Sequence, residues 1–186
     1  DEGAVSLCYF GDGAAQQGAF YEALELSQLW ALPAVFVIEN NFYAMGTSLE
    51  RQSYLTDMHL RAKGVGMASW QFGGFDVVEV YENVAKAVEH ARSGKGPVLL
   101  EAITYRFRGH SMSDPAKYRK AGELDEKKES DPIKLGRARL LERGTSDETL
   151  AAIDAEELQR AKDAYAFAMQ SPEPDPAALY AYTYSE

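Results

Sequence analysis

Two short polar segments carry residue types that bind metal ions and phosphates. Gly11-Asp12-Gly13 follows one apolar run, and Asn40-Asn41 follows a second. The Asp12 carboxylate, the Asn41 amide oxygen and a backbone carbonyl just after Asn41 are hard oxygen ligands of low total charge, which suit Mg²⁺. Gly13 lets a phosphate approach the backbone closely, and a helix beginning soon afterwards directs free N–H groups at the same place. The two segments therefore predict a metal-bridged diphosphate at a helix start.

A β-α-β unit is the element that must bring the two segments together. Apolar runs at 7–10 and 34–38 indicate two parallel strands, and apolar residues spaced three and four apart between 20 and 31 indicate the helix that connects them. Pro33 ends this helix. Ligands of open α/β sheets bind at the carboxyl ends of the strands, so we expect Asp12 and Asn41 to lie side by side at that edge.

The rest of the chain is expected to complete an α/β core and to add helices. We expect a third strand at 76–80, a helix at 82–93 and a fourth strand at 98–105, giving a parallel sheet flanked by helices. Residues 1–120 form this core. Residues 121–186 form a helical carboxyl-terminal region, with a helix start at Asp131-Pro132, a capping box at 145–148 and a long helix at 148–169. We expect this region, with its aromatic tail (Leu179, Tyr180, Tyr182 and Tyr184), to pack on the core or on a partner subunit.

Composition excludes several classes of function. A chain of 186 residues has room for one domain with a real core. Its net charge of −10 argues against nucleic-acid binding and against an anionic membrane surface. The single cysteine, Cys8, rules out a disulfide framework within the chain. We find no run of about 18 apolar residues, so we predict no membrane-spanning helix.

A basic loop follows the expected fourth strand, at the same edge of the sheet. Its cationic residues and its histidine stand out in an acidic chain, and they would attract a diphosphate or a carboxylate. They are Arg106, Arg108, His110, Lys117 and Arg119. His110 is the strongest catalytic candidate, because it follows a strand and because Gly109 before it permits a close backbone approach.

Together these segments resemble a known family. Gly-Asp-Gly followed after 26 residues by Asn-Asn is similar to the thiamin diphosphate motif. The chain resembles the α subunits of thiamin diphosphate-dependent 2-oxo acid dehydrogenases, most closely the pyruvate enzyme, through the segments GDGAAQQG, LWALP, ENNFYAMGTS, SGKGPVLLE and TYRFRGHSMSDPAKYR. The resemblance begins near residue 6 and is weakest after residue 119. It covers only the carboxyl-terminal half of such a subunit, so the amino-terminal part of the family domain is expected to be absent.

The resemblance implies thiamin diphosphate and Mg²⁺ as cofactors. It assigns the metal to Asp12, Asn41 and the backbone carbonyl of Tyr43, and the cofactor to Asp12, Gly13, Ala14 and Asn41. The chain departs from the family in one place. The usual Pro-Gly-x-x-Val-Asp-Gly is replaced at 68–74, with glycine standing at position 73 where the family has an acid.

The resemblance also implies roles for two loop residues. His110 would contact the cofactor, and Ser111 matches a regulatory phosphorylation site of mitochondrial members. The second phosphorylatable serine of the animal enzymes is missing from Ala116-Lys117-Tyr118, which favours a bacterial cytoplasmic protein over one of the mitochondrial matrix.

The implied activity is decarboxylation of pyruvate with reductive acetylation of lipoyl groups. The implied partners are a β subunit, in a heterotetramer, and the lipoyl domain of an acyltransferase component. In the family the β subunit supplies the glutamate that activates the cofactor, so we assign no residue here to that role. Met112-Ser113-Asp114-Pro115 favours pyruvate over branched-chain 2-oxo acids or acetoin. Two competing hypotheses are a fragment that folds without binding cofactor and a Mg²⁺-dependent phosphohydrolase, which would usually need a second acidic cluster.

Overall fold

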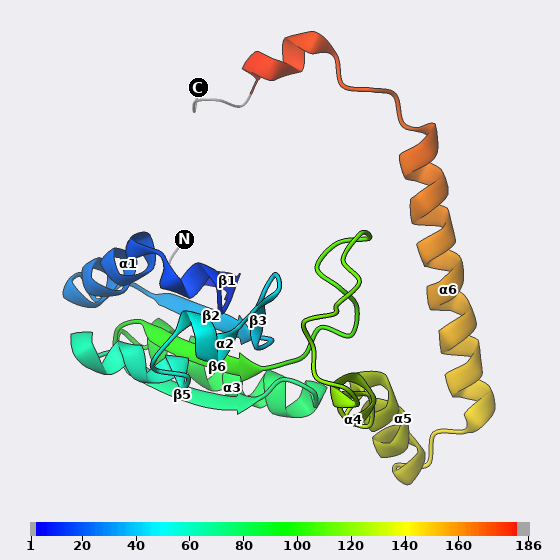
Figure 1. Ribbon diagram of the computed structural model, residues 1–186, viewed down its shortest axis with the longest axis horizontal. Coiled ribbons are helices and arrows are strands. Elements are labelled where there is room, and N and C mark those ends of the chain that lie inside the picture. Colours follow the sequence, from blue (N-terminus) through cyan, green and yellow to red (C-terminus); the bar gives the residue numbers. More distant parts are fainter. Residues whose placement is uncertain (1–2, 182–186) are drawn as a thin grey trace. The chain divides into compact units, whose positions relative to one another are not determined.

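The computed structural model describes residues 3–181 of the chain, which divides into two compact units, 1–138 and 139–186 (Figure 1). The first unit holds all the strands found in the described residues. The second holds the long helix and the segment that follows it. In residues 3–181 no helix is long and apolar enough to cross a membrane.

A four-stranded parallel sheet forms the centre of the first unit (Figure 1). Its strands lie in the order β1 (Ser6–Gly11), β2 (Ala34–Asn40), β6 (Val98–Ile103) and β5 (Ala68–Gly73). Gly11 pairs with Glu39, and Asn40 pairs with Ile103. The carboxyl ends of the strands therefore meet at one edge. Just beyond that edge, β3 (Tyr43–Ala44) and β4 (Thr47–Ser48) form a small antiparallel hairpin.

Helices cover both faces of the sheet, because side chains along a strand alternate between its two faces. On one face Ile38 and Leu99 pack with α1 (Gly18–Leu29) and η2 (Met58–Val65). On the other face Val37 and Leu100 pack with α3 (Val77–Arg92). Two short helical segments, η1 (Ala14–Gln16) and α2 (Leu49–Gln52), follow β1 and β4 respectively. The predicted α/β fold with helices on a parallel sheet is confirmed.

The third strand was predicted in the wrong place. Residues 76–80 belong to α3 and its N-cap, and the strand is β5, at 68–73. The run of β-branched residues after Asp76 suggested a strand, but the Asp76 carboxylate accepts a hydrogen bond from the backbone N–H of Val78 at 2.9 Å and so caps a helix. The four strands nevertheless form one parallel sheet, as expected.

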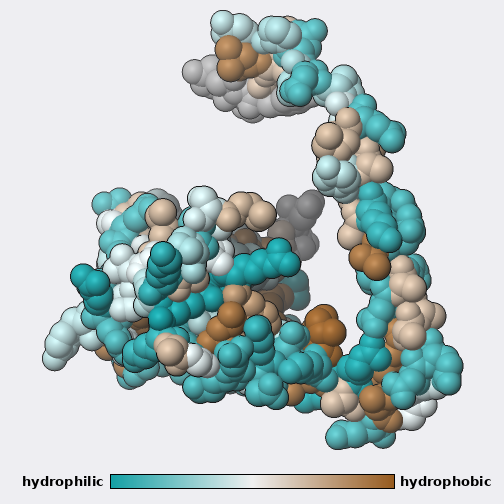
Figure 2. Space-filling model, turned by 45° about the vertical axis from the view of Figure 1, so that its right-hand side comes forward, coloured by the Kyte–Doolittle hydropathy of each residue, from teal (hydrophilic) through white to brown (hydrophobic). Residues whose placement is uncertain are grey.

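The carboxyl-terminal part is helical, as predicted. Its elements are α4 (Glu123–Lys128), α5 (Pro132–Glu142), α6 (Asp147–Gln170) and η3 (Pro176–Tyr180). Along α6, apolar and polar residues are mixed on the face seen in Figure 2, and Leu158, Tyr165 and Phe167 are exposed. The predicted boundary at residue 120 and the packing of residues 121–186 on the core or on a partner stay predictions. Tyr182 and Tyr184 lie outside the described residues.

Candidate metal and diphosphate site

Asp12 and Asn41 lie at the same edge of the sheet, on neighbouring strands. Asp12 directly follows Gly11 of β1, which is in register with Glu39 of β2. The Asp12 side chain is 1% exposed, and the backbone N–H of Asn41 hydrogen-bonds to its carboxyl group. One crossover through α1 has thus brought Asp12 and Asn41, which are 29 residues apart in the sequence, to the same edge of the sheet, where the Asn41 backbone contacts the Asp12 carboxyl group.

Burial dominates the electrostatics of Asp12. It raises the pKa of this carboxyl above the ordinary value. The side-chain amide of Gln52, the backbone N–H groups of Asp12 and Asn41, and the positive charge of Arg106 lower the pKa by a smaller amount. In particular, Nε2 of Gln52 donates a hydrogen bond to Oδ2 of Asp12. A cation at this carboxylate would stabilise the ionised form that burial disfavours, which is the behaviour expected of a metal ligand.

The segment after β2 is a sharp turn held by its own asparagines. Oδ1 of Asn40 accepts from the backbone N–H of Phe42 at 3.1 Å, and Oδ1 of Asn41 accepts from that of Tyr43 at 3.2 Å. Phe42 has φ 68°, a left-handed conformation that is uncommon for a residue with a side chain. Each amide oxygen has two lone pairs, so the Asn41 oxygen keeps one for a further ligand.

The turn that carries Gly13 and Ala14 is packed against the β3–β4 hairpin. A Cβ added at Gly13 would lie 2.7 Å from the Cβ of Ala44, so only glycine allows this approach. The helix expected to begin soon after Gly13 is preceded by the short η1, and α1 itself begins at Gly18. The guanidinium of Arg61 donates to the backbone oxygen of Ala15 at 2.6 Å, which fixes the turn from the η2 side.

The basic loop leaves β6 at this same edge, since the backbone N–H of Thr104 donates to the backbone oxygen of Asn40 at 2.9 Å. Arg106 donates to the backbone oxygen of Met45 in the hairpin at 2.8 Å, and its charge acts on Asp12. His110 is exposed, and its backbone N–H donates to Oδ2 of Asp114 at 2.7 Å. Arg106 is therefore the loop residue that the structure connects to Asp12, and a contact between His110 and the cofactor stays a prediction.

Asp114 organises the rest of that loop. It accepts from the backbone N–H groups of His110 and Ala116 and from the Tyr118 hydroxyl. These hydrogen bonds lower the pKa of its carboxyl to about 2. Ser111, the predicted regulatory residue, is exposed, and its hydroxyl lies 3.1 Å from that of Ser113.

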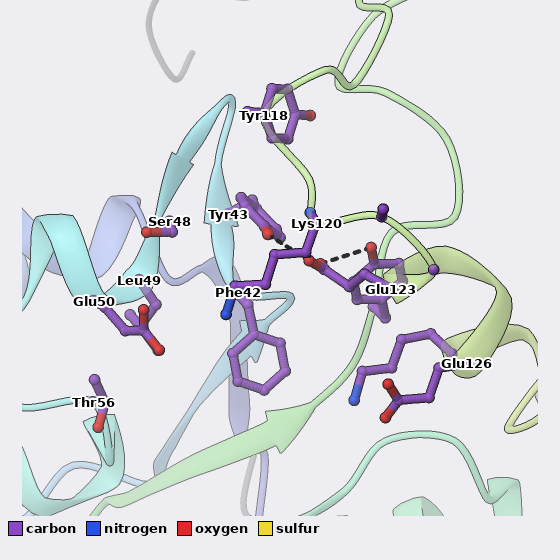
Figure 3. Close-up of a pocket in the computed structure, with 14 residues that line it drawn as sticks. Phe42, Tyr43, Ser48, Leu49, Glu50, Thr56, Tyr118, Lys120, Glu123 and Glu126 are labelled. Atoms are coloured by element: carbon purple, nitrogen blue, oxygen red, sulfur yellow. Dashed lines mark hydrogen bonds between the residues drawn. The ribbon is translucent and has the colours of Figure 1, made fainter.

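A cavity of about 770 Å³ lies between the hairpin, the end of β6 and α4 (Figure 3). The Tyr43 and Tyr105 hydroxyls both donate to Glu123 there, at 3.0 and 2.9 Å. Burial and the Glu123 hydrogen bond raise the pKa of Tyr105 to about 12. Burial alone would raise the pKa of Glu123, but hydrogen bonds from Tyr105, Lys120 and Tyr43 outweigh it and lower that pKa. The side chain of Tyr43 is thus fixed by its hydrogen bond to Glu123, whereas the predicted metal ligand is its backbone carbonyl.

Glu101 is a functional candidate that the sequence patterns did not reveal. It is fully buried within β6, and it accepts hydrogen bonds from Asn40, His59 and Gln71. The available signal was an acid inside the apolar strand Val98–Ile103, where an ionised side chain needs several donors. Within residues 3–181, no group of three or more His, Cys, Asp or Glu side chains is placed to hold a metal. The predicted site uses only one carboxylate.

The sequence as a whole identifies the class of protein. The chain belongs to the dehydrogenase E1 component family, whose sequence pattern matches residues 1–177. This family depends on thiamin diphosphate in general.

Among its relatives are three proteins named pyruvate dehydrogenase E1 component subunit alpha. The protein from Rhizobium meliloti is 49% identical over 95% of this chain and 51% of its own length. That from Zymomonas mobilis is 44% identical over 97% of this chain and 51% of its own length. A testis-specific mitochondrial form from Rattus norvegicus is 43% identical over 99% of this chain and 47% of its own length. The chain thus spans about half the length of these relatives.

Proposed function

We propose that this chain holds thiamin diphosphate through Mg²⁺ as part of the α subunit of a pyruvate-decarboxylating component. The observation that carries this proposal is the placement of the buried Asp12 carboxylate beside Asn41, at the carboxyl edge of a parallel sheet. Family membership and relatives with that printed name support it.

The residues present suit Mg²⁺. Asp12 would supply a carboxylate oxygen, Asn41 its amide oxygen and Tyr43 its backbone carbonyl, an all-oxygen set with one negative charge. Mg²⁺ is usually bound by one or two carboxylates and shares its remaining positions between water and phosphate oxygens. The backbone of Gly13 and Ala14 directly follows Asp12 in the sequence, and in the proposal it contacts the diphosphate.

Thiamin diphosphate supplies the nucleophilic carbon and the electron sink for decarboxylation of a 2-oxo acid. This chain supplies position and charge. Asp12 and Asn41 hold the cation, Arg61 fixes the turn at 14–16, and Arg106 adds positive charge beside the hairpin. In the proposal His110 contacts the cofactor, and Ser111 is a modification site in the same loop.

The finer assignments belong to the same proposal. The substrate is pyruvate and the acetyl unit passes to a lipoyl group of the acyltransferase component. A β subunit completes the heterotetramer, and the compartment is the bacterial cytoplasm. The relatives' printed names support the choice of pyruvate over branched-chain 2-oxo acids or acetoin.

Calorimetric titration of thiamin diphosphate at increasing Mg²⁺ concentrations tests the site. We expect the Asp12→Asn variant to need at least about tenfold more Mg²⁺ for half-maximal binding, equivalent to about 1.4 kcal/mol. Glu39→Gln is the matched control. It removes an exposed negative charge at the end of the neighbouring strand but no predicted ligand, so it should leave the Mg²⁺ requirement within about twofold. Equal Mg²⁺ requirements in the wild-type chain and Asp12→Asn would remove the metal assignment.

A further inference from the structure

Glu101 places a carboxyl group in the core of the first unit. Its side chain is 0% exposed, on the sheet face that α1 and η2 cover. Such a group is costly to bury unless its oxygens are fully hydrogen-bonded. Oε2 of Glu101 accepts from the backbone N–H of His59 at 3.0 Å and from Nε2 of Gln71 at 3.1 Å, and Nδ1 of His59 lies 3.1 Å away. Oε1 accepts from Nδ2 of Asn40 at 2.7 Å.

The hydrogen bond at Oε1 joins Glu101 to the metal-ligand turn, residues 40–43, which holds the predicted metal ligands Asn41 and Tyr43. An asparagine amide has one donating and one accepting end, and rotating it by half a turn exchanges them. Because Oε1 of Glu101 only accepts, it forces Nδ2 of Asn40 to face β6, and Oδ1 must then face the other way. That oxygen accepts from the backbone N–H of Phe42, the residue with left-handed φ that starts the turn.

We propose that Glu101 is a positioning residue for the metal-ligand turn. It fixes the orientation of the Asn40 amide, Asn40 holds Phe42 in its left-handed conformation, and this conformation directs Asn41 and the Tyr43 carbonyl towards the cation. The role rests on the proposed function, because the turn matters to chemistry only if it binds the metal.

Exchanging the hydrogen-bond donor and acceptor between positions 40 and 101 tests this role. In Glu101→Gln, the amide oxygen is held at the Oε2 position by the His59 and Gln71 donors, so an NH₂ group faces the NH₂ group of Asn40. The Asn40 amide must then rotate and loses its bond to Phe42. In Asn40→Asp, two carboxylates face each other. In the double variant, the glutamine NH₂ at position 101 donates to the carboxylate at position 40, whose other oxygen still accepts from Phe42.

Two measurements report whether Glu101 acts on the metal-ligand turn through Asn40. Amide hydrogen exchange of Phe42 reports the turn itself, and the Mg²⁺ concentration for half-maximal thiamin diphosphate binding reports its consequence. In each single variant we expect the Phe42 amide to exchange at least about tenfold faster than in the wild type, and half-maximal binding to need at least about tenfold more Mg²⁺. In the double variant we expect both values to return to within about threefold of the wild type. Asn40→Ala, which breaks both bonds without adding a charge, replaces Asn40→Asp if that variant does not fold.

Gln71→Ala is the matched control, because it removes a hydrogen bond from the same carboxylate but not the one to Asn40. We expect it to lower the melting temperature and to leave both measurements unchanged. Wild-type values in Glu101→Gln, or a double variant no better than its single parents, would overturn the positioning role. If the wild-type chain shows no Mg²⁺-dependent binding, the proposed function fails, while Phe42 exchange still decides whether Glu101 orients the turn.

Discussion

At the scale of single residues, two aspartates of the first unit have opposite electrostatic surroundings. Asp12 is buried, which raises its pKa, and a bound cation would offset this effect. Asp114 lies in an exposed loop where three donors converge on it and lower its pKa to about 2. The first arrangement suits a metal ligand, and the second suits a residue that orders a loop.

Asp114 gives a prediction about pH. Its pKa is about 2 in the folded chain against an ordinary value of 3.8, so its contribution to stability is present above pH 3.8 and is lost as the pH falls towards 2. Tyr118→Phe removes one donor and should raise the pKa of Asp114 towards the ordinary value. A carboxyl ¹³C titration by NMR measures this shift. Ser113→Ala is the control, since that hydroxyl contacts Ser111 and not Asp114. An unchanged Asp114 pKa in Tyr118→Phe would show that the phenol is not a donor.

The placement of Asp12 and Asn41 at one edge of the sheet could be predicted from the sequence, and other contacts around them could not. Asp12 and Asn41 could be found because each follows an apolar strand at a spacing that allows one crossover. Glu101 was missed because its partners His59 and Gln71 are 42 and 30 residues away, and no local pattern connects them. Gln52 was missed for the same reason, as its contact with Asp12 spans 40 residues.

At the scale of elements, the η1 turn and the hairpin must approach closely for the site to form. Gly13→Ala would place a methyl group 2.7 Å from the Cβ of Ala44, and we expect it to lower the free energy of unfolding by about 1–3 kcal/mol. Gly11→Ala is the matched control, because a Cβ there meets nothing within 4 Å, so a change within about 0.5 kcal/mol is expected. Urea unfolding of both variants provides the comparison. Equal losses of unfolding free energy in the two variants would mean that backbone freedom, and not the Ala44 contact, determines the effect of alanine at position 13.

At the start of α6, the capping residue in the structure differs from the one that the sequence pattern predicted. The pattern predicted a capping box at Thr145–Glu148, whereas Ser146 is the N-cap and accepts from the backbone N–H of Thr149 at 3.2 Å. Ser146→Ala should therefore destabilise the helix by about 1 kcal/mol. Thr145→Ala should have a smaller effect, because Thr145 takes part through its backbone N–H, bonded to Leu140. Amide exchange of the first turn of α6 measures both, and a larger effect from Thr145→Ala would identify Thr145 as the cap.

The misplaced third strand shows where local patterns fail. β5 contains serine and glutamine and ends in glycine, so it lacks the apolar run that marks β2 and β6. It becomes a strand because β6 offers it an open edge, with Ala68 opposite Val98. The valines at 77–80 have a strong strand preference, but the Asp76 cap and the apolar face shared with Val84 and Val88 favour the helix.

At the scale of the whole molecule, the fold class could be predicted because alternating strands and helices permit few arrangements. The order of the strands in the sheet could not be predicted, since β6 lies between β2 and β5 although it is the last of the four strands in the sequence. That placement is what brings Glu101 beside Asn40 and the basic loop to the same edge as Asp12.

The proposed metal site is tested most directly by a crystal structure of the chain grown with thiamin diphosphate and Mn²⁺ in place of Mg²⁺, with anomalous diffraction to locate the metal. We expect one strong peak about 2.0–2.3 Å from a carboxylate oxygen of Asp12 and from Oδ1 of Asn41, with the Tyr43 carbonyl as a third protein ligand. An anomalous peak elsewhere, with Asp12 still bonded to Gln52 and no metal beside it, would contradict the assignment of Asp12 and Asn41 as metal ligands.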